Sequence, residues 1–528
     1  MNYSINSIWR KKTMQFAGLL ILALWTNTAL RAADDSNSSH PTVSMKTELS
    51  VGSKVKIKIV ATGEVKLSGV KNATDFVNGK PITYTLSDKL ITIEGLVTEL
   101  DCSNAKLTQL DVSQASELKK LYCYSNKLEG IDVRSNEHLT HLNCSGNALN
   151  ALDLSQNKHL QGLYCYDNKL SELNLRVNTE LAILYCHNNA LKSLPLGDNK
   201  ALTELYCRDN KLTQLDVSNN EKLRVLSCGQ NQISVLDLKK NRELEGLGCS
   251  NNLLSEINVD ENKKLKWFYC YGNKLSQVLL SAHNLLEELD CGKNPIESID
   301  LKQLQALKEL TVDGCKLTEL DLSANRGLEK LICSDNNLSG LDLTHNAKLT
   351  HLTCNNNKLT TLNLEGMPKL VEVRLWGNRI EGASMTTIMQ ALPQPEQGVL
   401  ALIYVIDSKG SSEGNKCLDT DVKIAKAKNW LVCDFNGSEN DAVEYDGLQS
   451  SAVEVVADGT AFSFSRGNGT IELSGALAHS VVMFYSVEGI CLGETKADAM
   501  GHASFSIPDE VGGIYIVRSG DRAFKLQI

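Results

Sequence analysis

Cysteine recurs in this chain at a fixed interval of 21 residues, and this interval restricts the fold more than any other feature of the sequence. Twelve cysteines lie on the register: Cys102, Cys123, Cys144, Cys165, Cys186, Cys207, Cys228, Cys249, Cys270, Cys291, Cys333 and Cys354. Val312 and Leu375 hold the remaining positions, so fourteen copies of one unit span residues 97–383 without insertion or deletion. Short repeats that each contact only their neighbours build a solenoid, and a chain of 528 residues then needs no single large core.

Each copy supplies about six apolar residues at fixed places. In one copy these are Leu118, Leu121, Cys123, Leu128, Ile131 and Val133. Alternation of apolar and polar residues around each cysteine predicts a short strand, and strands of successive copies form one parallel sheet on the concave side. Three residues after the cysteine comes an asparagine such as Asn126, whose amide can satisfy backbone groups that the turn leaves in the core. We therefore predict an α/β-type leucine-rich repeat solenoid with a parallel β-sheet and little helix.

The cysteines themselves allow two interpretations. Exported proteins meet oxidising conditions, which favour disulfides. Side chains on one column of a solenoid point the same way, however, and parallel Cβ directions suit a disulfide poorly. Val312 and Leu375 fill the same position, so we predict buried thiols that act as small hydrophobic groups. Outside the ladder, Cys417 and Cys433 are the better candidates for a bonded pair, and for them a disulfide and two free thiols both stay open.

The N-terminal residues 1–32 have the pattern of a secretory signal peptide. Arg10, Lys11 and Lys12 precede an apolar run at 16–25, and the small residues Ala32 and Ala33 follow it. We therefore expect a secreted protein that leaves the cytoplasm, with an uncleaved N-terminal anchor as the alternative.

The other flanking segments are predicted from composition and alternation. Residues 33–96 form a β-rich cap, in which the lysines at 54, 56 and 58 lie on a solvated strand face. Residues 384–436 form a C-terminal cap with helices at 384–392 and 422–428 and strands at 399–406 and 430–432. The acidic segment 437–456 is a predicted linker, and residues 457–528 form a β-sandwich with glycine turns.

Two parts of the chain resemble known families. The pattern L-x-x-L-x-C-x-x-N-x-L-x-x-L-D-V/L-x-x-N-x-x is similar to the cysteine-ladder leucine-rich repeats of internalin J-like bacterial surface proteins. This resemblance implies an extracellular adhesin or binding protein without specifying its ligand.

The last seventy or so residues resemble the C-terminal sorting domain of type IX secretion cargo. The resemblance rests on the segments 482–485, 488–489 and 513–517 and on Lys525, and it implies passage across the outer membrane through the secretion translocon, removal of the domain, and attachment to surface lipopolysaccharide. The resemblance thus implies a cell-surface protein attached to the outer membrane. The segment Ser486-Val487-Glu488-Gly489 departs from the family, which more often carries Asp or Asn before the glycine, so an ordinary β-sandwich is the alternative.

The concave face carries the candidate binding residues. Side chains three before, one before and one after each ladder position point outward there, and they are rich in aromatic rings. The predicted binding residues are Tyr122, Tyr124, Tyr164, Tyr166, Tyr185, Tyr206, Arg208, Trp267, Tyr269, Tyr271 and Trp376. Rigid aromatic rings suit contacts with protein or sugar, although packing between strands is the alternative explanation. Small residues such as Ser227, Gly246 and Gly248 form a stripe without large side chains between the aromatic residues. This stripe either accommodates a protruding element of a partner or reflects neutral sequence drift.

Signals for other functions are weak. A net charge of −9 without a basic stripe argues against nucleic acid. The segment 137–141 contains a Glu and two His residues, but a surface pair explains it better than a metal site. An Asp column that includes Asp111 and Asp132 suits turn hydrogen bonds better than a calcium ladder. We predict a non-enzymatic protein without metal or cofactor that binds a host or neighbouring-cell macromolecule, with a polysaccharide-binding module or a structural surface-layer component as alternatives.

Overall fold

The structure is a computed structural model that describes residues 42–438 and 442–448, together with parts of 463–527. The gaps within that last range are 468–469, 475, 477, 487–490, 507–513 and 520–521. The predicted signal peptide at 1–32 and the dipeptide at 488–489 lie outside the described residues. No helix in the described ranges has the length and apolar character needed to cross a membrane.

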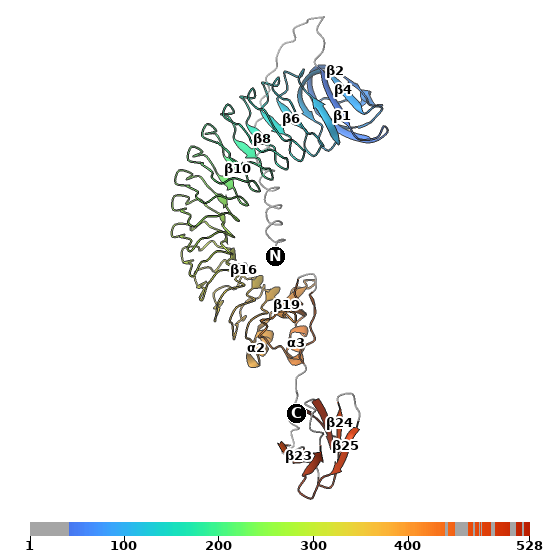
Figure 1. Cartoon of the computed structure of the whole chain (residues 1–528), viewed down its shortest axis with the longest axis vertical. Helices are drawn as coiled ribbons and strands as arrows, with labels where there is room; N and C mark the ends of the chain where they lie inside the picture. The colour runs from blue at the N-terminus through green and yellow to red at the C-terminus, as the bar shows by residue number, and fades with distance from the viewer. Residues whose placement is uncertain are drawn as a thin grey trace.

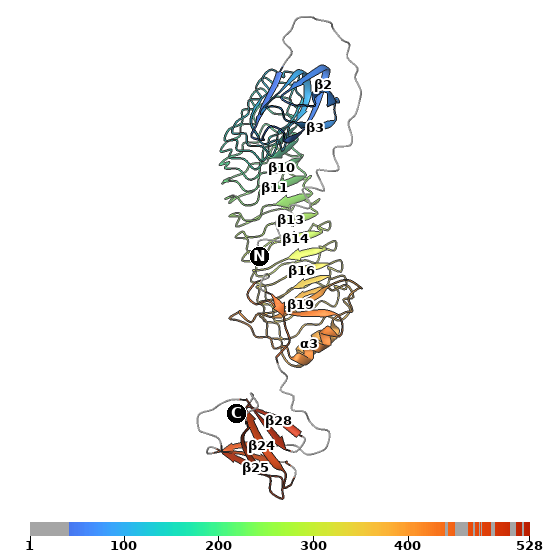
Figure 2. The ribbon, with the colours of Figure 1, turned by 90° about the vertical axis from the view of Figure 1, so that its right-hand side faces the viewer.

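The repeats form a curved solenoid whose inner side is a parallel sheet (Figures 1 and 2). Its strands are β6 (Lys120–Tyr122), β7 (His141–Asn143), β8 (Gly162–Tyr164), β9 (Ile183–Tyr185), β10 (Glu204–Tyr206), β11 (Val225–Ser227), β12 (Gly246–Gly248), β13 (Trp267–Tyr269), β14 (Glu288–Asp290), β15 (Glu309–Thr311), β16 (Lys330–Ile332), β17 (His351–Thr353) and β18 (Glu372–Arg374). Neighbouring strands pair in parallel with a shift of one repeat, as in Leu121 opposite Leu142. The predicted solenoid with a parallel sheet and little helix is confirmed.

The core is continuous from the first cap to the second. The middle residue of each strand and the ladder residue that follows it point inward, and all twelve ladder cysteines are free thiols without exposed surface. Burying a large aliphatic side chain contributes about 1.5–3 kcal/mol, but only where the next coil covers it. Each coil is therefore stabilised mainly by its two neighbours.

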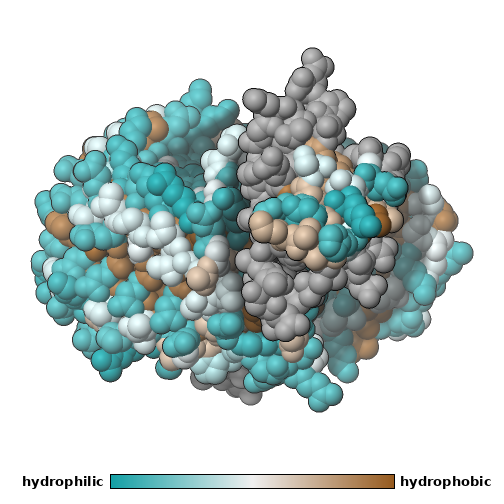
Figure 3. Space-filling view, turned by 90° about the horizontal axis from the view of Figure 1, so that it is seen from below, coloured by the Kyte–Doolittle hydropathy of each residue, from teal (hydrophilic) through white to brown (hydrophobic). Residues whose placement is uncertain are grey.

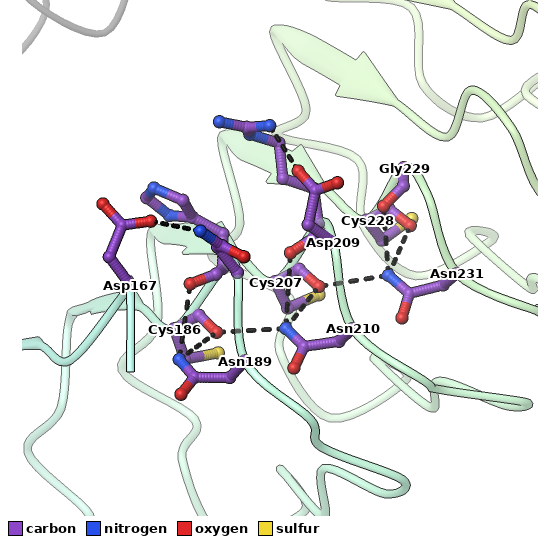
Figure 4. Close-up of polar contacts among 12 residues, drawn as sticks. Asp167, Cys186, Asn189, Cys207, Asp209, Asn210, Cys228, Gly229 and Asn231 are labelled. Atoms are coloured by element: carbon purple, nitrogen blue, oxygen red, sulfur yellow. Dashed lines mark hydrogen bonds and ion pairs between the residues drawn. The ribbon is translucent and has the colours of Figure 1, made fainter. Parts of the chain in front are cut away.

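Buried or partly buried asparagines join each coil to the one before it (Figure 4). The Asn210 amide donates to the carbonyl oxygens of Cys186 at 3.0 Å and Cys207 at 3.1 Å, and its Oδ1 accepts from the N–H of Leu191 at 2.9 Å. A second asparagine column lies in the opposite turn, where Asn157 donates to the carbonyls of Val133 and Asn136. Both columns satisfy backbone groups that the turns leave inside the core.

The second residue after each ladder position has a left-handed backbone. This position holds Gly272, with φ 65°, and Asn188, with φ 53°, but also Gln230, with φ 52°. Glycine adopts this conformation freely, whereas a residue with a Cβ is strained there by about 1–2 kcal/mol unless its side chain is Asn or Asp. The turn therefore tolerates other residues at some loss of stability.

Replacing Gln230 with glycine is expected to raise the free energy of unfolding by about 0.5–1 kcal/mol, because relief of strain exceeds the entropy that glycine adds to the unfolded chain. The Gln230 side chain is exposed, so few contacts are lost. Gln232→Gly is the matched control, since Gln232 is also exposed but is not among the residues with positive φ, and it should be destabilising. Urea unfolding curves of the two variants test this, and equal destabilisation by both would contradict it.

The N-terminal cap shares a strand with the first coil. It consists of β1 (Thr42–Thr47), β2 (Lys54–Ser68), a short 3₁₀ helix (Ala73–Asp75), β3 (Pro81–Thr85) and β4 (Leu90–Asp101). β4 pairs antiparallel with β1 and β2, and its last residues pair in parallel with β6. β1 also pairs with β5 (Leu107–Asp111) on the other side of the first coil. A single strand thus crosses the boundary that the sequence pattern places between residues 96 and 97.

The C-terminal cap continues the parallel sheet. It contains α2 (Ala383–Ala391), β19 (Ala401–Ile406), α3 (Asp419–Lys426) and β20 (Trp430–Asp434), and β18, β19 and β20 pair in parallel. A further strand, β21 (Val443–Glu444), pairs antiparallel with β20, and the Asp419 N–H donates to the Leu448 carbonyl at 2.8 Å. The backbone pairing of the cap therefore extends to Leu448, which lies within the segment 437–456 predicted as a linker.

Cys417 and Cys433 are both free thiols. Each sulfur lies 3.9 Å from a carbonyl of its own segment, that of Leu418 for Cys417 and that of Leu431 for Cys433. The disulfide considered for this pair is therefore absent.

The last module has two sheets, as expected for a β-sandwich. Its strands are β22 (Ser463–Gly467), β23 (Thr470–Ser474), β24 (Val481–Ser486), β25 (Cys491–Lys496), β26 (Ala503–Ser506), β27 (Ile514–Ser519) and β28 (Arg522–Gln527). One sheet has the order β22-β23-β26 and the other β25-β24-β27-β28. Phe484 stacks on Phe505 at 5.4 Å in a core separate from that of the solenoid.

When the whole chain is viewed end-on, most of its coloured surface is hydrophilic, with small apolar patches (Figure 3).

Candidate functional site

The concave surface, formed by the outward side chains of β6 to β18, is the candidate site. Its aromatic residues gather in two places. The first aromatic cluster comprises Tyr164, Tyr166, Tyr185, His187 and Tyr206. The second comprises Trp267, Tyr269 and Tyr271.

Rings of the first aromatic cluster contact one another directly. The Tyr185 ring centroid lies 5.0 Å from that of Tyr164 and 4.5 Å from that of Tyr206. Tyr166 stacks on His187 at 4.4 Å with an interplanar angle of 7°. These separations are typical of favourable aromatic pairs. The Tyr185 hydroxyl also donates to Glu204 Oε2 at 2.6 Å, which fixes the central ring.

Members of this cluster differ in exposure. Tyr185 and Tyr206 are only 8% and 5% exposed, so their rings mainly stabilise the sheet, whereas Tyr164, Tyr166 and His187 stay partly exposed. Burial, with Glu204 adding to it, raises the pKa of both buried tyrosines, which are therefore neutral phenols. Burial, and to a lesser extent Arg208, lowers the pKa of His187 to about 4, so its imidazole is neutral at physiological pH. The cluster is a neutral, rigid surface.

Four predicted residues lie outside the two clusters: Tyr122, Tyr124, Arg208 and Trp376. Tyr122 and Tyr124 are partly exposed on the first coils, and burial raises the pKa of Tyr122 to about 12. Arg208 is partly exposed and forms an ion pair with Asp209 in its own turn.

Trp376 belongs to the contact between solenoid and C-terminal cap. It is 5% exposed and stacks on Phe435 at 4.2 Å with an interplanar angle of 9°. The Tyr404 ring lies edge-on to it at 6.1 Å. Because cap residues cover this ring, we leave Trp376 out of the proposed binding surface.

The second aromatic cluster occupies the space above Gly246, one residue of the stripe of small residues. Trp267 stacks on Tyr269 at 5.2 Å, and a Cβ placed on Gly246 would lie 2.0 Å from atoms of the Trp267 ring. Glycine at 246 therefore makes room for the indole, and the proposal that this stripe seats a partner element was wrong at Gly246. Tyr271 extends the cluster, with the Lys293 ammonium 5.4 Å from its ring centroid.

Four acidic residues lie beside the second aromatic cluster, and the sequence analysis did not single them out. This acidic group comprises Glu288, Asp290, Glu309 and Asp313. The Tyr269 hydroxyl donates to Glu288, which connects the cluster to the group. The only sequence signal was that all four occupy outward positions, 21 or 23 residues apart, which a search for local motifs overlooks.

On the described part of the chain, little supports a metal site or a calcium-binding role for the Asp column. No group of three or more His, Cys, Asp and Glu side chains there is arranged to hold a metal ion. His141 lies in β7 with its Nδ1 3.0 Å from Thr140 Oγ1, while His138 is exposed in the preceding loop. In the Asp column, Asp111 Oδ1 accepts from the Ser113 N–H at 2.9 Å, a turn hydrogen bond that its counterparts repeat along the solenoid.

No protein-family model and no curated protein matches this sequence. Among solved structures, the functional domain of InlJ from Listeria monocytogenes, which includes a cysteine ladder, is similar with a TM-score of 0.61 and 24% identity, covering 84% of this chain and 92% of that one. A leucine-rich repeat protein from Leptospira interrogans has a TM-score of 0.53 and 27% identity, covering 56% of this chain and 82% of its own. These similarities and the coil geometry establish the fold as a leucine-rich repeat solenoid with a cysteine ladder.

Proposed function

We propose that this protein is a non-enzymatic, secreted surface protein whose concave face binds a macromolecule of a host or neighbouring cell. The observation that carries the proposal is the set of partly exposed aromatic side chains on a rigid sheet, above all Tyr166 stacked on His187. Such rings are preformed, so binding orders few side chains and loses little entropy. Extended concave surfaces of this kind are what solenoid proteins use for recognition.

Export and anchoring form the second part of the proposal. The predicted signal peptide supports entry into the secretory route, and the resemblance of the last module to a sorting domain supports passage across the outer membrane. We propose that the mature chain is attached to the cell surface after this module is removed. The two-sheet fold of the module suits both a sorting domain and an ordinary binding domain.

Protease treatment of intact cells, followed by measurement of the mass of the mature chain, tests the location. We expect accessible protein that lacks the N-terminal signal and roughly the last seventy residues, as export with a removable sorting domain requires. Full-length protein protected inside the cell would contradict the proposal.

Binding by the concave face is tested by Tyr124→Ser combined with Tyr166→Ser. Serine occurs at the equivalent positions Ser145 and Ser250, so the fold should tolerate both changes. Because exposed aromatic anchors at an interface contribute about 2 kcal/mol each, we expect attachment of cells carrying this variant to partner cells to fall about tenfold or more. Val235→Ser combined with Leu253→Ser removes two exposed apolar side chains outside the sheet and serves as the control. Equal attachment by both variants would favour a purely structural role.

A further inference from the structure

The acidic group is an unfavourable arrangement for the isolated protein. Glu288 and Glu309 lie directly opposite each other on the paired strands β14 and β15. Like charges in that position destabilise a sheet. Asp290 and Asp313 lie beside them, on the strand and on the turn of consecutive coils.

Within the acidic group, Asp313 gives the strongest evidence for a ligand. It is 6% exposed, and its Oδ1 has no hydrogen-bond partner. This oxygen points at the preceding coil, where a Cβ on Gly292 would lie only 2.2 Å from it. Gly292 in turn donates its N–H to Asp290 Oδ1 at 3.2 Å, so both carboxyl groups lie close to that glycine. A buried carboxylate oxygen without a donor is costly, and a ligand that donates to it would remove the penalty.

Other charged groups face this pair from each neighbouring element. Lys293 follows β14, Lys330 lies on β16, and Asp335 follows β16. Burial, with Asp313 adding to it, raises the pKa of Asp290 to about 7. Burial also raises the pKa of Asp313 to about 6, with Lys293 opposing and Asp335 adding to the shift. The nearby lysines therefore do not offset the burial of the two carboxyl groups.

We propose that Asp290 and Asp313, flanked by Glu288 and Glu309, form a subsite for a cationic side chain of a basic protein segment. An arginine guanidinium or a lysine ammonium would donate to both carboxylates, including the unpartnered Oδ1 of Asp313. This inference rests on the proposed function and specifies part of it, namely that the partner is a protein that presents basic residues.

The test compares two double variants that remove the same charge. Asp290→Asn with Asp313→Asn keeps hydrogen-bond capacity, and asparagine already occupies the equivalent positions Asn143 and Asn355. The control, Asp300→Asn with Asp342→Asn, changes two exposed turn residues whose column also holds asparagine in other coils. The probe is hexa-arginine peptide, and the measurement is isothermal titration calorimetry of the purified protein.

At about pH 8 we expect the site variant to bind hexa-arginine about tenfold more weakly than the unmodified protein, a difference of about 1.4 kcal/mol, and the control to bind as the unmodified protein does. Lowering the pH to about 5 protonates carboxyl groups whose pKa values are raised, so binding by the unmodified protein should weaken. The site variant should lose most of this pH dependence, while any histidine contribution persists in both proteins.

Equal weakening in site variant and control would overturn the proposal, because the acidic surface as a whole would then attract the peptide. Binding of a neutral oligosaccharide in place of hexa-arginine would also overturn it, in favour of a glycan site. Failure of the attachment experiment with Tyr124 and Tyr166 would instead count against the proposed function, since the peptide titration needs neither cells nor the natural partner.

Discussion

Replacing Asn210 with alanine is expected to lower the free energy of unfolding by about 2–5 kcal/mol, because the change leaves buried backbone groups without partners. The Leu191 N–H loses its acceptor, and the carbonyls of Cys186 and Cys207 each lose a donor. These bonds join two coils, so their loss weakens the contact between coils as well as the turn itself. Urea unfolding followed by circular dichroism measures the effect.

Lys211→Ala is the control for this experiment, since Lys211 is the next residue and its side chain is exposed. It should change the free energy of unfolding by less than about 0.5 kcal/mol. If Asn210→Ala were as mild as this control, water would have to replace the amide inside the solenoid, and the ladder would not be needed for stability.

Alkylation of the ladder thiols is expected to be at least about a thousandfold slower in the native protein than in the unfolded chain. Burial raises the pKa of Cys144 and Cys228 to about 12, so the thiolate is almost absent at neutral pH, and neither sulfur is accessible. Peptide mapping after iodoacetamide treatment, with and without urea, measures the difference at each position.

A Lys211→Cys variant supplies an exposed thiol that should react in the native state and so controls for the reagent. Ladder cysteines that react as fast as this introduced thiol would contradict the buried column. A decrease in the mass of the intact protein that shows disulfides between neighbouring coils would also contradict the buried column, because the parallel side-chain directions disfavour such bonds.

Much of the fold follows from the repeat alone. Since no insertion interrupts the register, every strand from β6 to β18 ends immediately before its ladder residue, where the alternation predicts it. The departures in the asparagine column needed the structure to explain. In the first coil Ala105 replaces the asparagine, and the cap residue Thr47 donates its hydroxyl to the Ala105 carbonyl at 2.6 Å. In the eleventh coil the Cys315 thiol lies 3.6 Å from the Cys291 carbonyl and only partly replaces an amide.

The binding surface was harder to predict because outward side chains are affected by neighbours that are distant in sequence. Trp376 is covered by Phe435 and Tyr404, which belong to the cap, and Trp267 fills the space above Gly246 in the previous coil. Periodicity identifies outward positions but does not tell which of them neighbours cover. For the same reason the pairing of Asp290 with Asp313 emerges only when coils are stacked.

The regular stacking of the coils also sets the distance between the first aromatic cluster and the acidic group. Parallel strands lie about 4.8 Å apart, so the partly exposed Tyr164 on β8 and Asp290 on β14, six strands away, are separated by about 29 Å along the sheet. A short side chain or a single sugar residue can reach only one of these places. Under the proposed function, a partner that contacts both places must extend over at least that distance and present an aromatic-binding group and a basic residue at matching separation, so size as well as chemistry would restrict which partners fit.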